Sequence, residues 1–520
     1  MSTVAGAPTQ AIVGIDVGTT GVKAVAFGVD TPWQRMVLRE YPLLQPRPGW
    51  QVQDPAMVAA ETERALADCV TATGDAEVLA VAVGTAMHGL LGLDAALEPL
   101  TPLITWADAR AHDEAAQLRA AGLAGDLHRR TGTPVHPMTP LTKLMWFARH
   151  EPELCARVRW WVGLKELVLA RLTGTIVTEL SSASGTGMLD MAARAWSPEA
   201  LELAGVPAAH LPEIRPTTAI LPLSAECARR IGLPAGTPVV VGAADGPLGN
   251  LGTSAMSPGV AGLSLGTSGA IRMGVDTPTV DEHGSLFCYA LTDTAWVVGG
   301  AVSNGASVVR WARRALTPDL HGDAGAGGAD EALLELAAAA PAGSDGLVML
   351  PYLLAERAPL WDPDLPGAVL GLRDLHTRAH LVRAAVEGVC MQLRVVLEQL
   401  DGLAPVHTVR ATGGAFRSPL WRDVMAASLD RPLRAVGAAA GTALGAAGIG
   451  LFAIGRASGL TDAVAQLSPA GEAEPAVEPD RELVAIYDRL RHATPGLIDG
   501  LGAFADLLRG QAGRGPPGPR

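Results

Sequence analysis

The chain has 520 residues, which is too long for one hydrophobic core of ordinary size, so at least two domains are expected. With 48% hydrophobic and 18% charged residues, the composition is that of a packed globular protein and excludes a largely disordered chain. The formal net charge of −13 argues against a general nucleic-acid binder, which needs a basic surface for phosphates.

The cysteines and the first residues bear on the location of the protein. Five cysteines are scattered without close pairing, which predicts neither a disulfide framework nor a zinc site and indicates a reducing cytoplasm. Met1 to Val4 lack the basic segment and apolar stretch of a signal peptide, so export is not expected. The uncharged stretch Ala435 to Gly455 is long enough for a membrane span, but its alanines and glycines favour a buried, close-packed helix and no membrane partner.

One strand-turn-strand pattern occurs twice. Two apolar runs flank Gly18-Thr19-Thr20-Gly21 within residues 12–27 and predict a strand, a tight turn and a second strand. The pattern returns within residues 260–273 around Gly266-Thr267-Ser268-Gly269. Each copy lies near the start of about half the chain, so we expect two domains of similar architecture that face each other through equivalent hairpins.

The segments around these hairpins predict alternating helices and strands. An apolar strand is predicted at residues 78–83, and helices are predicted at residues 55–69, 110–121, 301–315, 377–400 and 481–492. This alternation predicts an α/β fold. The last residues, Gly510 to Arg520, are expected to be disordered.

Both turns favour phosphate binding. Glycines let phosphate oxygens reach backbone N–H groups and threonine hydroxyls add donors, so two such turns can hold one triphosphate. Neither turn has the glycine-lysine ending of a P-loop or the following helix of a dinucleotide fingerprint. Asp16 precedes the first turn, where a carboxylate can hold magnesium, usually through waters, beside the phosphates. The alternative is that Asp16 only caps the turn.

A second aspartate follows another apolar strand. Val239 to Val241 lead into Gly242-Ala243-Ala244-Asp245-Gly246, which places Asp245 at a strand end exposed to a cleft. Phosphoryl transfer to an alcohol needs a base near the attacking hydroxyl, and Asp245 is our candidate for that base. The alternative is an ordinary Asp-Gly turn.

Three further segments favour ligand binding. Met87 and His88 follow an apolar strand, and Trp106 and Asp108 lie a little further on. Polyol recognition uses such mixtures of donors, acceptors and flat apolar faces. The alternative places Trp106 in the core and makes Asp108 the cap of the following helix. Later in the chain, a strand enters the turn Gly413-Gly414, against which a flat adenine could lie, although glycine pairs are common in this chain.

In their order and spacing these motifs resemble the FGGY family of carbohydrate kinases, over about residues 12–455. The resemblance implies the two-domain α/β fold of sugar kinases and actin-like ATPases, which is ribonuclease H-like, with the active site in the cleft between the domains. It further implies a sugar-binding N-terminal FGGY domain with the first phosphate hairpin at residues 1–246. An ATP-binding C-terminal FGGY domain at 247–460 and a helix with a disordered tail at 461–520 would follow.

The resemblance also implies that the protein is a kinase that uses ATP and Mg²⁺, and it assigns roles to residues. Asp245 is expected to be the catalytic base and, together with Asp16, a metal ligand. The residues expected to contact the substrate are Met87, His88, Trp106, Asp108 and Asp245. The residues expected to bind the nucleotide are Gly18, Thr19, Thr20, Lys23, Gly266, Thr267, Gly305, Gly413, Gly414 and Ala415.

Within the family, the chain is most similar to bacterial gluconokinases, through residues 132–138, 141–143, 287–291 and 356–361. This similarity implies transfer of the γ-phosphoryl group of ATP to the 6-hydroxyl of D-gluconate, which gives 6-phospho-D-gluconate. The carboxylate of this sugar acid needs a cation, and Lys143, Lys165 and Arg110 are candidates for it. Alternatively, the two lysines are solvated helix residues.

Three other functions stay open. A xylulokinase or another FGGY kinase would use Met87-His88-Gly89 and the segment from Trp106 to Arg110 equally well. A non-catalytic sugar sensor would keep the fold, but the intact Gly242 to Gly246 segment argues against it. An actin-like ATPase would assemble with partners and sediment with ATP. The family resemblance also implies a homodimer.

Overall fold

The computed structural model describes residues 9–320, 326–437, 441–468 and 475–512. The chain forms two compact units, each built from separate stretches of sequence. Unit 1 comprises Met1–Pro258, Met273–Val298 and Ala439–Glu472, and unit 2 comprises Gly259–Arg272, Gly299–Ala438 and Ala473–Arg520. The domain boundaries given above remain sequence predictions. The expected disorder of Gly510 to Arg520 falls largely outside the described residues.

Unit 1 is built on a six-stranded sheet with the order β13-β14-β5-β1-β2-β3. Its strands are β1 (Gln10–Val17), β2 (Gly21–Gly28), β3 (Gln34–Glu40), β5 (Glu77–Thr85), β13 (Ile220–Pro222) and β14 (Pro238–Val240). β1, β2 and β3 are antiparallel neighbours, whereas β1, β5 and β14 run parallel. Parallel strands end at the same edge of a sheet, so this edge collects the segments that follow β1, β5 and β14.

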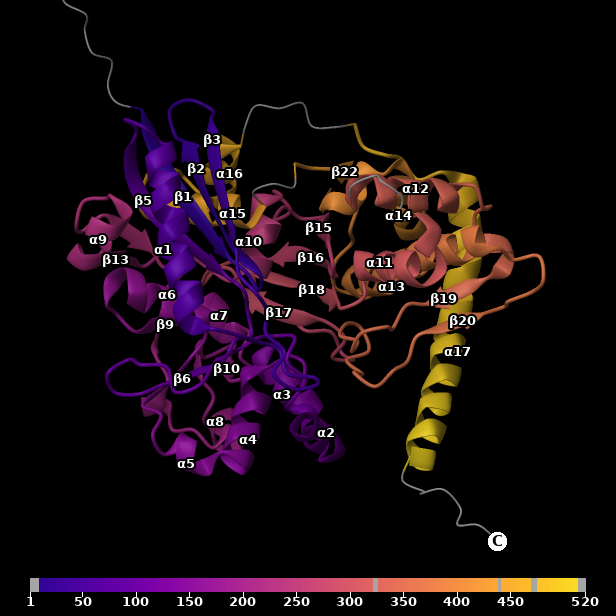
Figure 1. Cartoon of the computed structure of the whole chain (residues 1–520), viewed down its shortest axis with the longest axis horizontal. Helices are drawn as coiled ribbons and strands as arrows, with labels where there is room; N and C mark the ends of the chain where they lie inside the picture. The colour runs from indigo at the N-terminus through magenta and orange to yellow at the C-terminus, as the bar shows by residue number, and fades with distance from the viewer. Residues whose placement is uncertain (1–8, 321–325, 438–440, 469–474, 513–520) are drawn as a thin grey trace, which may run out of the picture. The chain divides into compact units, whose positions relative to one another are not determined.

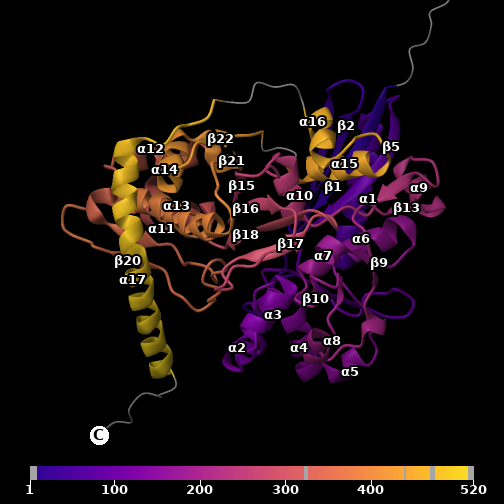
Figure 2. The same cartoon turned by 180° about the vertical axis from the view of Figure 1, so that it is seen from behind.

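Both faces of this sheet are buried, which explains why its central strands are continuous apolar runs. One face packs against α1 (Pro55–Ala72), α6 (Leu164–Thr173) and α9 (Ala225–Ile231). The other packs against α10 (Asp245–Gly252), α15 (Gly441–Ala453) and α16 (Leu460–Leu467). α1 lies in front of the indigo strands in Figure 1, and α15 and α16 lie in front of them in Figure 2.

The alanine- and glycine-rich segment is a close-packed helix, as predicted. A Cβ atom on Gly14 of β1 would lie 2.0 Å from the carbonyl oxygen of Ala443, so strand and helix touch through their backbones. The predicted bounds were wrong, because Leu433–Ala435 forms β22 and α15 begins only at Gly441. Among the described residues, no helix combines the length and the apolar character that crossing a membrane requires.

The rest of unit 1 consists of shorter elements. The helices are α2 (His112–Ala120), α3 (Ala124–Thr131), α4 (Pro140–His150), α5 (Pro152–Cys155), α7 (Leu180–Ser184) and α8 (Pro198–Ala204). The strands are β4 (Val52–Gln53), β6 (Leu91–Leu93), β7 (Leu103–Ile104), β8 (Trp160–Val162), β9 (Val177–Glu179), β10 (Leu189–Asp190), β11 (Ala195–Trp196) and β12 (Glu213–Arg215). These elements carry the loops that the sequence assigns to the sugar.

A second six-stranded sheet has the order β17-β18-β16-β15-β21-β22. Its further strands are β15 (Val260–Leu265), β16 (Gly269–Val275), β17 (Phe287–Ala290), β18 (Trp296–Val302) and β21 (Thr408–Thr412). β15, β21 and β22 are parallel neighbours. In each sheet a strand-turn-strand hairpin is followed by two parallel strands, which agrees with the predicted internal duplication.

Unit 2 surrounds its strands with longer helices. These are α11 (Ala306–Leu316), α12 (Ala326–Ala338), α13 (Arg378–Leu403), α14 (Pro419–Leu429) and α17 (Arg481–Ala512), and a hairpin of β19 (Val348–Leu350) and β20 (Ala368–Leu370) accompanies them. α17, yellow in Figure 2, packs on α13 and α14. The helix predicted at residues 481–492 is confirmed but extends further, and the one predicted from residue 301 begins later, because β18 runs to Val302.

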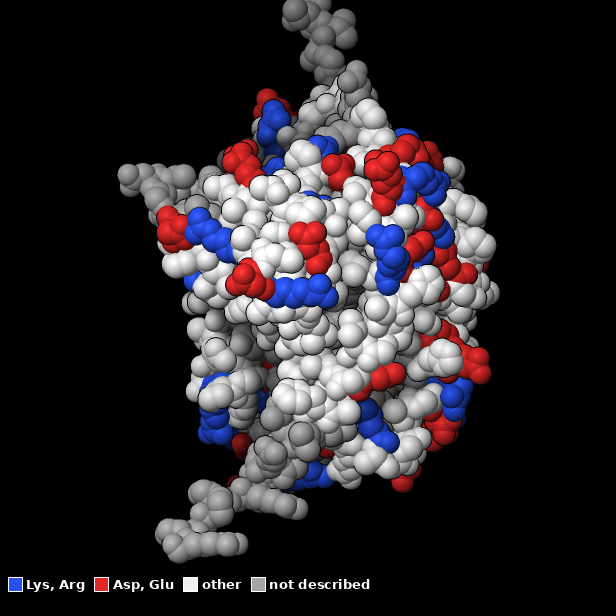
Figure 3. Space-filling view, turned by 90° about the vertical axis from the view of Figure 1, so that its right-hand side faces the viewer, with Lys and Arg blue, Asp and Glu red and all other residues white. Residues whose placement is uncertain are grey.

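The surface is charged in a mixed way. Figure 3 shows acidic and basic side chains interspersed on the face it presents. Ion pairs of this kind in unit 2 include Arg481 with Asp430 at 3.1 Å and Arg378 with Asp319 at 2.6 Å. Such exposed pairs contribute little to stability individually, about 0–1 kcal/mol each.

Candidate active site

Two aspartates and the loop after β5, which carries Met87 and His88, meet at the carboxyl edge of the unit 1 sheet. Asp16 is the penultimate residue of β1 and lies opposite Gly84 of β5. The residue after Gly84, Thr85, forms a parallel bridge with Ala244, which directly precedes Asp245. Asp245 is the first residue of α10, and one of its carboxylate oxygens accepts a hydrogen bond from the N–H of Gly246 at 2.8 Å. The topology therefore brings Asp16 and Asp245 together, although they are far apart in sequence.

The electrostatics of Asp16 reflect this proximity. Although part of the residue remains accessible, protein atoms surround the carboxylate. The pKa of Asp16 is raised to about 6, chiefly by burial and also by the negative charge of Asp245, while the positive charge of Lys23 opposes both. Two carboxylates that disfavour each other's charge would be relieved by a cation placed beside them.

The first turn is held through its carbonyl groups. The N–H of Gly18 donates to the carbonyl oxygen of Gly21 at 2.8 Å, which closes the turn. The hydroxyl of Tyr41 donates to the carbonyl oxygen of Gly18 at 2.8 Å, and the side-chain amide of Gln53 donates to that of Thr19 at 2.8 Å. Carbonyl oxygens repel phosphate, so a turn whose carbonyls are bonded inward is suited to present amides and hydroxyls to an anion.

Trp106 connects this turn to the loop after β7, the second segment predicted to contact the sugar. Its indole N–H donates to the hydroxyl oxygen of Thr19 at 2.9 Å. The hydroxyl hydrogen of Thr19 must then point to another acceptor. Trp106 keeps part of its surface exposed, so the alternative that it belongs to the core is wrong.

Asp108 is fully engaged by protein donors. Its side chain accepts from the Arg110 guanidinium at 2.8 and 2.9 Å and from the N–H of Gln51 at 2.7 Å. Only 1% of the residue is exposed. The alternative that Asp108 caps the next helix is also wrong, because α2 begins after Ala111 without a side-chain cap. Asp108 instead fixes Arg110, whose guanidinium lies 3.7 Å from the ring centre of Trp50.

The loop after β5 has an unusual backbone. His88 adopts a φ of 64°, a left-handed conformation that costs a non-glycine residue energy and often marks a functional site. Its Nδ1 lies 2.7 Å from the carbonyl oxygen of Gly185, and a carbonyl can only accept, so Nδ1 carries a hydrogen. The ring of Tyr289 meets the His88 ring edge-on at 5.6 Å between ring centres.

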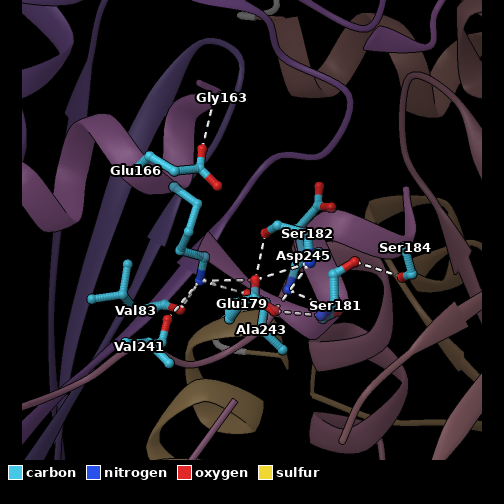
Figure 4. Close-up of polar contacts among 12 residues, drawn as sticks. Val83, Gly163, Glu166, Glu179, Ser181, Ser182, Ser184, Val241, Ala243 and Asp245 are labelled. Atoms are coloured by element: carbon cyan, nitrogen blue, oxygen red, sulfur yellow. Dashed lines mark hydrogen bonds and ion pairs between the residues drawn. The ribbon is translucent and has the colours of Figure 1, made fainter. Parts of the chain in front are cut away.

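The two lysines considered for the carboxylate are neither solvated nor directed at a ligand. Lys143 is 0% exposed and Lys165 is 1% exposed. The ammonium group of Lys143 donates to the carbonyl oxygens of His88, Thr105 and Met138. The ammonium group of Lys165 donates to the carbonyl oxygens of Val83, Val241 and Ala243, three residues that Figure 4 labels. The sequence interpretation is therefore corrected in both of its alternatives, because each ammonium group is consumed by three main-chain acceptors.

Unit 2 gathers the other predicted nucleotide residues at one edge of its parallel strands. The second turn follows β15 and the Gly413-Gly414 turn follows β21, and these two strands are parallel. The N–H of Ala306, at the start of α11, donates to the carbonyl oxygen of Gly266 at 2.8 Å, and Arg310 donates to the hydroxyl of Thr267 at 2.9 Å. A Cβ on Gly305 would lie 2.7 Å from the carbonyl carbon of Ser268, so only glycine fits against this turn.

Several residues of these sites lie outside the motifs that the sequence displays. Tyr41, Gln53 and Arg310 hold the two turns, but each lies outside the Gly-Thr motifs. Glu179, which is 0% exposed, contacts Lys165. A carboxylate inside the apolar run from Ile176 to Leu180 was a possible signal, because an unpaired charge is rarely buried.

Known proteins resemble this chain over most of its length. The N-terminal domain model of the FGGY family of carbohydrate kinases matches residues 11–252, and the C-terminal domain model matches residues 261–454. The gluconokinase of Bacillus subtilis (strain 168) is 38% identical over 86% of this chain and 88% of its own length. The xylulose kinase of Escherichia coli (strain K12) is 31% identical over 92% of this chain and 96% of its own.

Solved structures of sugar kinases also resemble this chain over nearly its whole length. The gluconate kinase from Lactobacillus acidophilus superimposes with a TM-score of 0.88 and 31% identity, covering 95% of this chain and 100% of that one. The xylulose kinase from Lactobacillus acidophilus gives a TM-score of 0.89 and 32% identity, over 96% of this chain and 100% of that one. With both domain models matched in order, the chain belongs to the FGGY family of carbohydrate kinases.

Proposed function

We propose that this carbohydrate kinase transfers the γ-phosphoryl group of ATP to the 6-hydroxyl of D-gluconate. The choice of gluconate as the substrate is supported by the sequence identity of 38% to gluconokinases from two Bacillus species. The identity to the xylulose kinase of Escherichia coli is 31%. The structural likenesses do not separate the two, at 31% and 32% identity. A xylulose kinase therefore remains the second candidate.

Asp245 is the proposed catalytic base. It begins α10 at the edge where β5 ends and the loop with Met87 and His88 begins, so a hydroxyl bound there can lie within reach of its carboxylate. Its carboxylate would accept the proton of the hydroxyl that attacks the γ-phosphorus. Trp106 and Asp108 are proposed to serve the same substrate, Asp108 through the guanidinium of Arg110 that it holds.

The carboxylates of Asp16 and Asp245 fit a divalent cation such as Mg²⁺. They raise each other's energy when both are charged, and within the described residues no cluster of three or more His, Cys, Asp or Glu exists that would form a complete protein cage. Mg²⁺ prefers such partial sites, where phosphates and waters complete an octahedron. When bound, the ion would neutralise charge on the phosphates. Asp16 and Asp245 would hold it on the protein side.

The glycine turns are the proposed nucleotide sites. In unit 1, Gly18, Thr19, Thr20 and Lys23 would contact phosphates, and in unit 2 Gly266 and Thr267 would do so, with Gly305 behind them. The adenosine would lie against Gly413, Gly414 and Ala415. The inward bonding of the carbonyls in both turns supports this assignment.

The test is ATP- and Mg²⁺-dependent phosphorylation of gluconate, xylulose, glycerol and ribulose by the purified protein. We expect gluconate to have the highest kcat/KM. A clear preference for xylulose would replace the substrate but keep the kinase, whereas no turnover on any sugar would favour a sensor. Asp245→Asn should lose about 10²–10⁴-fold in kcat, the usual contribution of general-base catalysis, while its ATP affinity stays close to that of the wild type. Retained turnover in this variant would remove Asp245 from the base role.

A further inference from the structure

The buried ammonium group of Lys165 has a position that helix stability does not explain. Lys165 is the second residue of α6, and a positive charge at a helix N-terminus is unfavourable. Its Nζ donates to the carbonyl oxygens of Val241 at 2.8 Å and Ala243 at 2.9 Å, and also to that of Val83. An ammonium group has three N–H donors, so all of them are used on main-chain carbonyls.

Those carbonyls belong to the chain segment that leads into Asp245. Val241 and Ala243 lie between the end of β14 at Val240 and the start of α10 at Asp245, outside both regular elements. Gly242 between them has a φ of 70°, and a Cβ there would lie 2.1 Å from the carbonyl oxygen of Val83. Buried carbonyls of such an irregular segment need donors, and Lys165 supplies them.

A second chain of contacts reaches the same segment from the other side. Glu179 Oε1 lies 3.8 Å from Lys165 Nζ, and both side chains are buried. The Glu179 carboxylate caps α7: it accepts hydrogen bonds from the backbone N–H groups of Ser181 and Ser182 and from the Ser182 hydroxyl. The hydroxyl oxygen of Ser181 in turn accepts from the N–H of Ala244 at 3.2 Å. Figure 4 shows Glu179 and Ser181 beside Asp245.

Lys143 has the same chemistry at a different place. It lies on α4, and its Nζ donates to the carbonyl oxygens of His88 at 2.6 Å, Thr105 at 2.8 Å and Met138 at 2.8 Å. His88 is the residue with the left-handed backbone, and Thr105 directly precedes Trp106. Lys143 therefore ties together the loops assigned to the sugar, and among the described residues the acceptors of its ammonium group lie outside the segment that leads into Asp245.

We propose that these two lysines are positioning residues with separate tasks: Lys165, with Glu179 and Ser181, fixes the catalytic Asp245, and Lys143 fixes the sugar-binding loops. The inference rests on the proposed kinase function but not on the identity of the sugar. It predicts that loss of Lys165 appears in kcat and loss of Lys143 appears in KM for the sugar. Neither side chain touches the reacting atoms.

The first test compares Lys165→Met with Lys143→Met on whichever sugar the wild type phosphorylates. A misplaced catalytic group costs up to about 100-fold, so Lys165→Met should lower kcat by about 10–100-fold with the sugar KM within about threefold of wild type. Lys143→Met should raise the sugar KM by about 10-fold with a smaller change in kcat. The same pattern in both variants would overturn the division of tasks.

A purely structural role is tested by removing both buried charges at once. Lys165→Met leaves the buried Glu179 without its cation, which is strongly destabilising, whereas the double variant Lys165→Met/Glu179→Leu replaces the pair with apolar groups. We expect the double variant to recover most of the lost Tm but not the lost kcat. Recovery of both would show that Lys165 only stabilises the fold, and would overturn the proposal.

Two further variants complete the test. Ser181→Ala keeps both charges and removes only the acceptor for the Ala244 N–H, so it should fold normally and still lower kcat by about threefold or more. Glu63→Gln breaks two ion pairs of the same unit, with Arg230 at 2.8 Å and Arg171 at 2.5 Å, neither of which involves Asp245, and should lower Tm while kcat is unchanged. An inactive wild type would instead overturn the proposed function, whereas an active wild type with normal kcat in Lys165→Met and Ser181→Ala would overturn only this inference.

Discussion

The two Gly-Thr turns have nearly the same sequence but different surroundings. The first follows Asp16, and the side chains of Tyr41, Gln53 and Trp106 hold it. In the second, Ser264 stands at the position that corresponds to Asp16, and the N-terminal amides of α11 hold the turn together with Arg310. The backbone motif is thus common to both, and the residue two positions before it differs between a carboxylate and a hydroxyl.

This difference implies a division of labour in the proposed reaction. A carboxylate beside a phosphate turn can hold a cation at the reacting group, whereas the neutral hydroxyl of Ser264 brings no negative charge to attract one. We therefore expect changes around the first turn to lower kcat, and changes around the second turn to raise KM for ATP.

The largest effect is expected for Asp16→Asn. Losing a charge that holds Mg²⁺ at the phosphates should lower kcat by at least about 100-fold, because electrostatic stabilisation is the main source of catalysis in phosphoryl transfer. The Mg²⁺ concentration that gives half of the maximal rate should also rise. Initial rates at varied Mg²⁺ measure both quantities.

The same variant carries an internal control. Asn keeps the shape of Asp16 but removes the like charge that the neighbouring Asp245 disfavours, so Tm should be unchanged or higher. A variant of normal stability and normal kcat would mean that Asp16 only caps the turn.

A smaller effect is expected for Gly305→Ala at the second turn. The added methyl group would press on the carbonyl of Ser268 and displace the turn, so KM for ATP should rise by about 10-fold while the sugar KM stays constant. Gly402→Ala is the matched control in the same unit, because a Cβ at Gly402 meets nothing within 4 Å. A loss confined to kcat in Gly305→Ala would contradict the asymmetry between the turns.

The fold could largely be predicted from sequence, because its signals are local. The apolar runs on both sides of each Gly-Thr turn, in residues 12–27 and 260–273, are strands, and the sheets repeat as the turns predicted. The error at residue 301 has a physical reason as well. Val297 to Val302 is a short apolar run with glycines, and periodicity alone does not distinguish a buried strand from the start of a helix.

The surroundings of the site could not be predicted in the same way. Lys143 and Lys165 occur in ordinary helical sequence, and nothing near them indicates burial. The ammonium group of Lys165 donates to the carbonyl oxygens of Val83 and Val241, which lie near the ends of two strands and are far from Lys165 in the sequence. The role of Asp108 could not be predicted either. In the sequence, an aspartate that caps a helix cannot be distinguished from one that binds Arg110, because the conformation of the loop decides between them. Motifs therefore locate reacting groups, whereas the groups that hold them depend on tertiary contacts.

The smallest effect is expected for Tyr41→Phe at the first turn. The variant loses the hydrogen bond from the Tyr41 hydroxyl to the carbonyl oxygen of Gly18 at 2.8 Å. Such a bond contributes about 0.5–1.5 kcal/mol, so kcat/KM should fall by roughly 2–10-fold, mainly through kcat. Arg310→Met, which removes the donor to Thr267 in the second turn, should instead change mainly KM for ATP.

The pH dependence of the Tyr41→Phe effect sharpens the comparison. Burial, and to a lesser degree the negative charge of Asp16, raise the pKa of Tyr41 above its usual value. A raised pKa keeps the phenol protonated to higher pH, so the hydroxyl remains a donor throughout the range in which the enzyme can be assayed. The ratio of wild-type to Tyr41→Phe kcat/KM should therefore be the same at pH 7 and pH 9. A ratio that falls towards 1 at the higher pH would mean that Tyr41 ionises there and does not hold the turn as a donor.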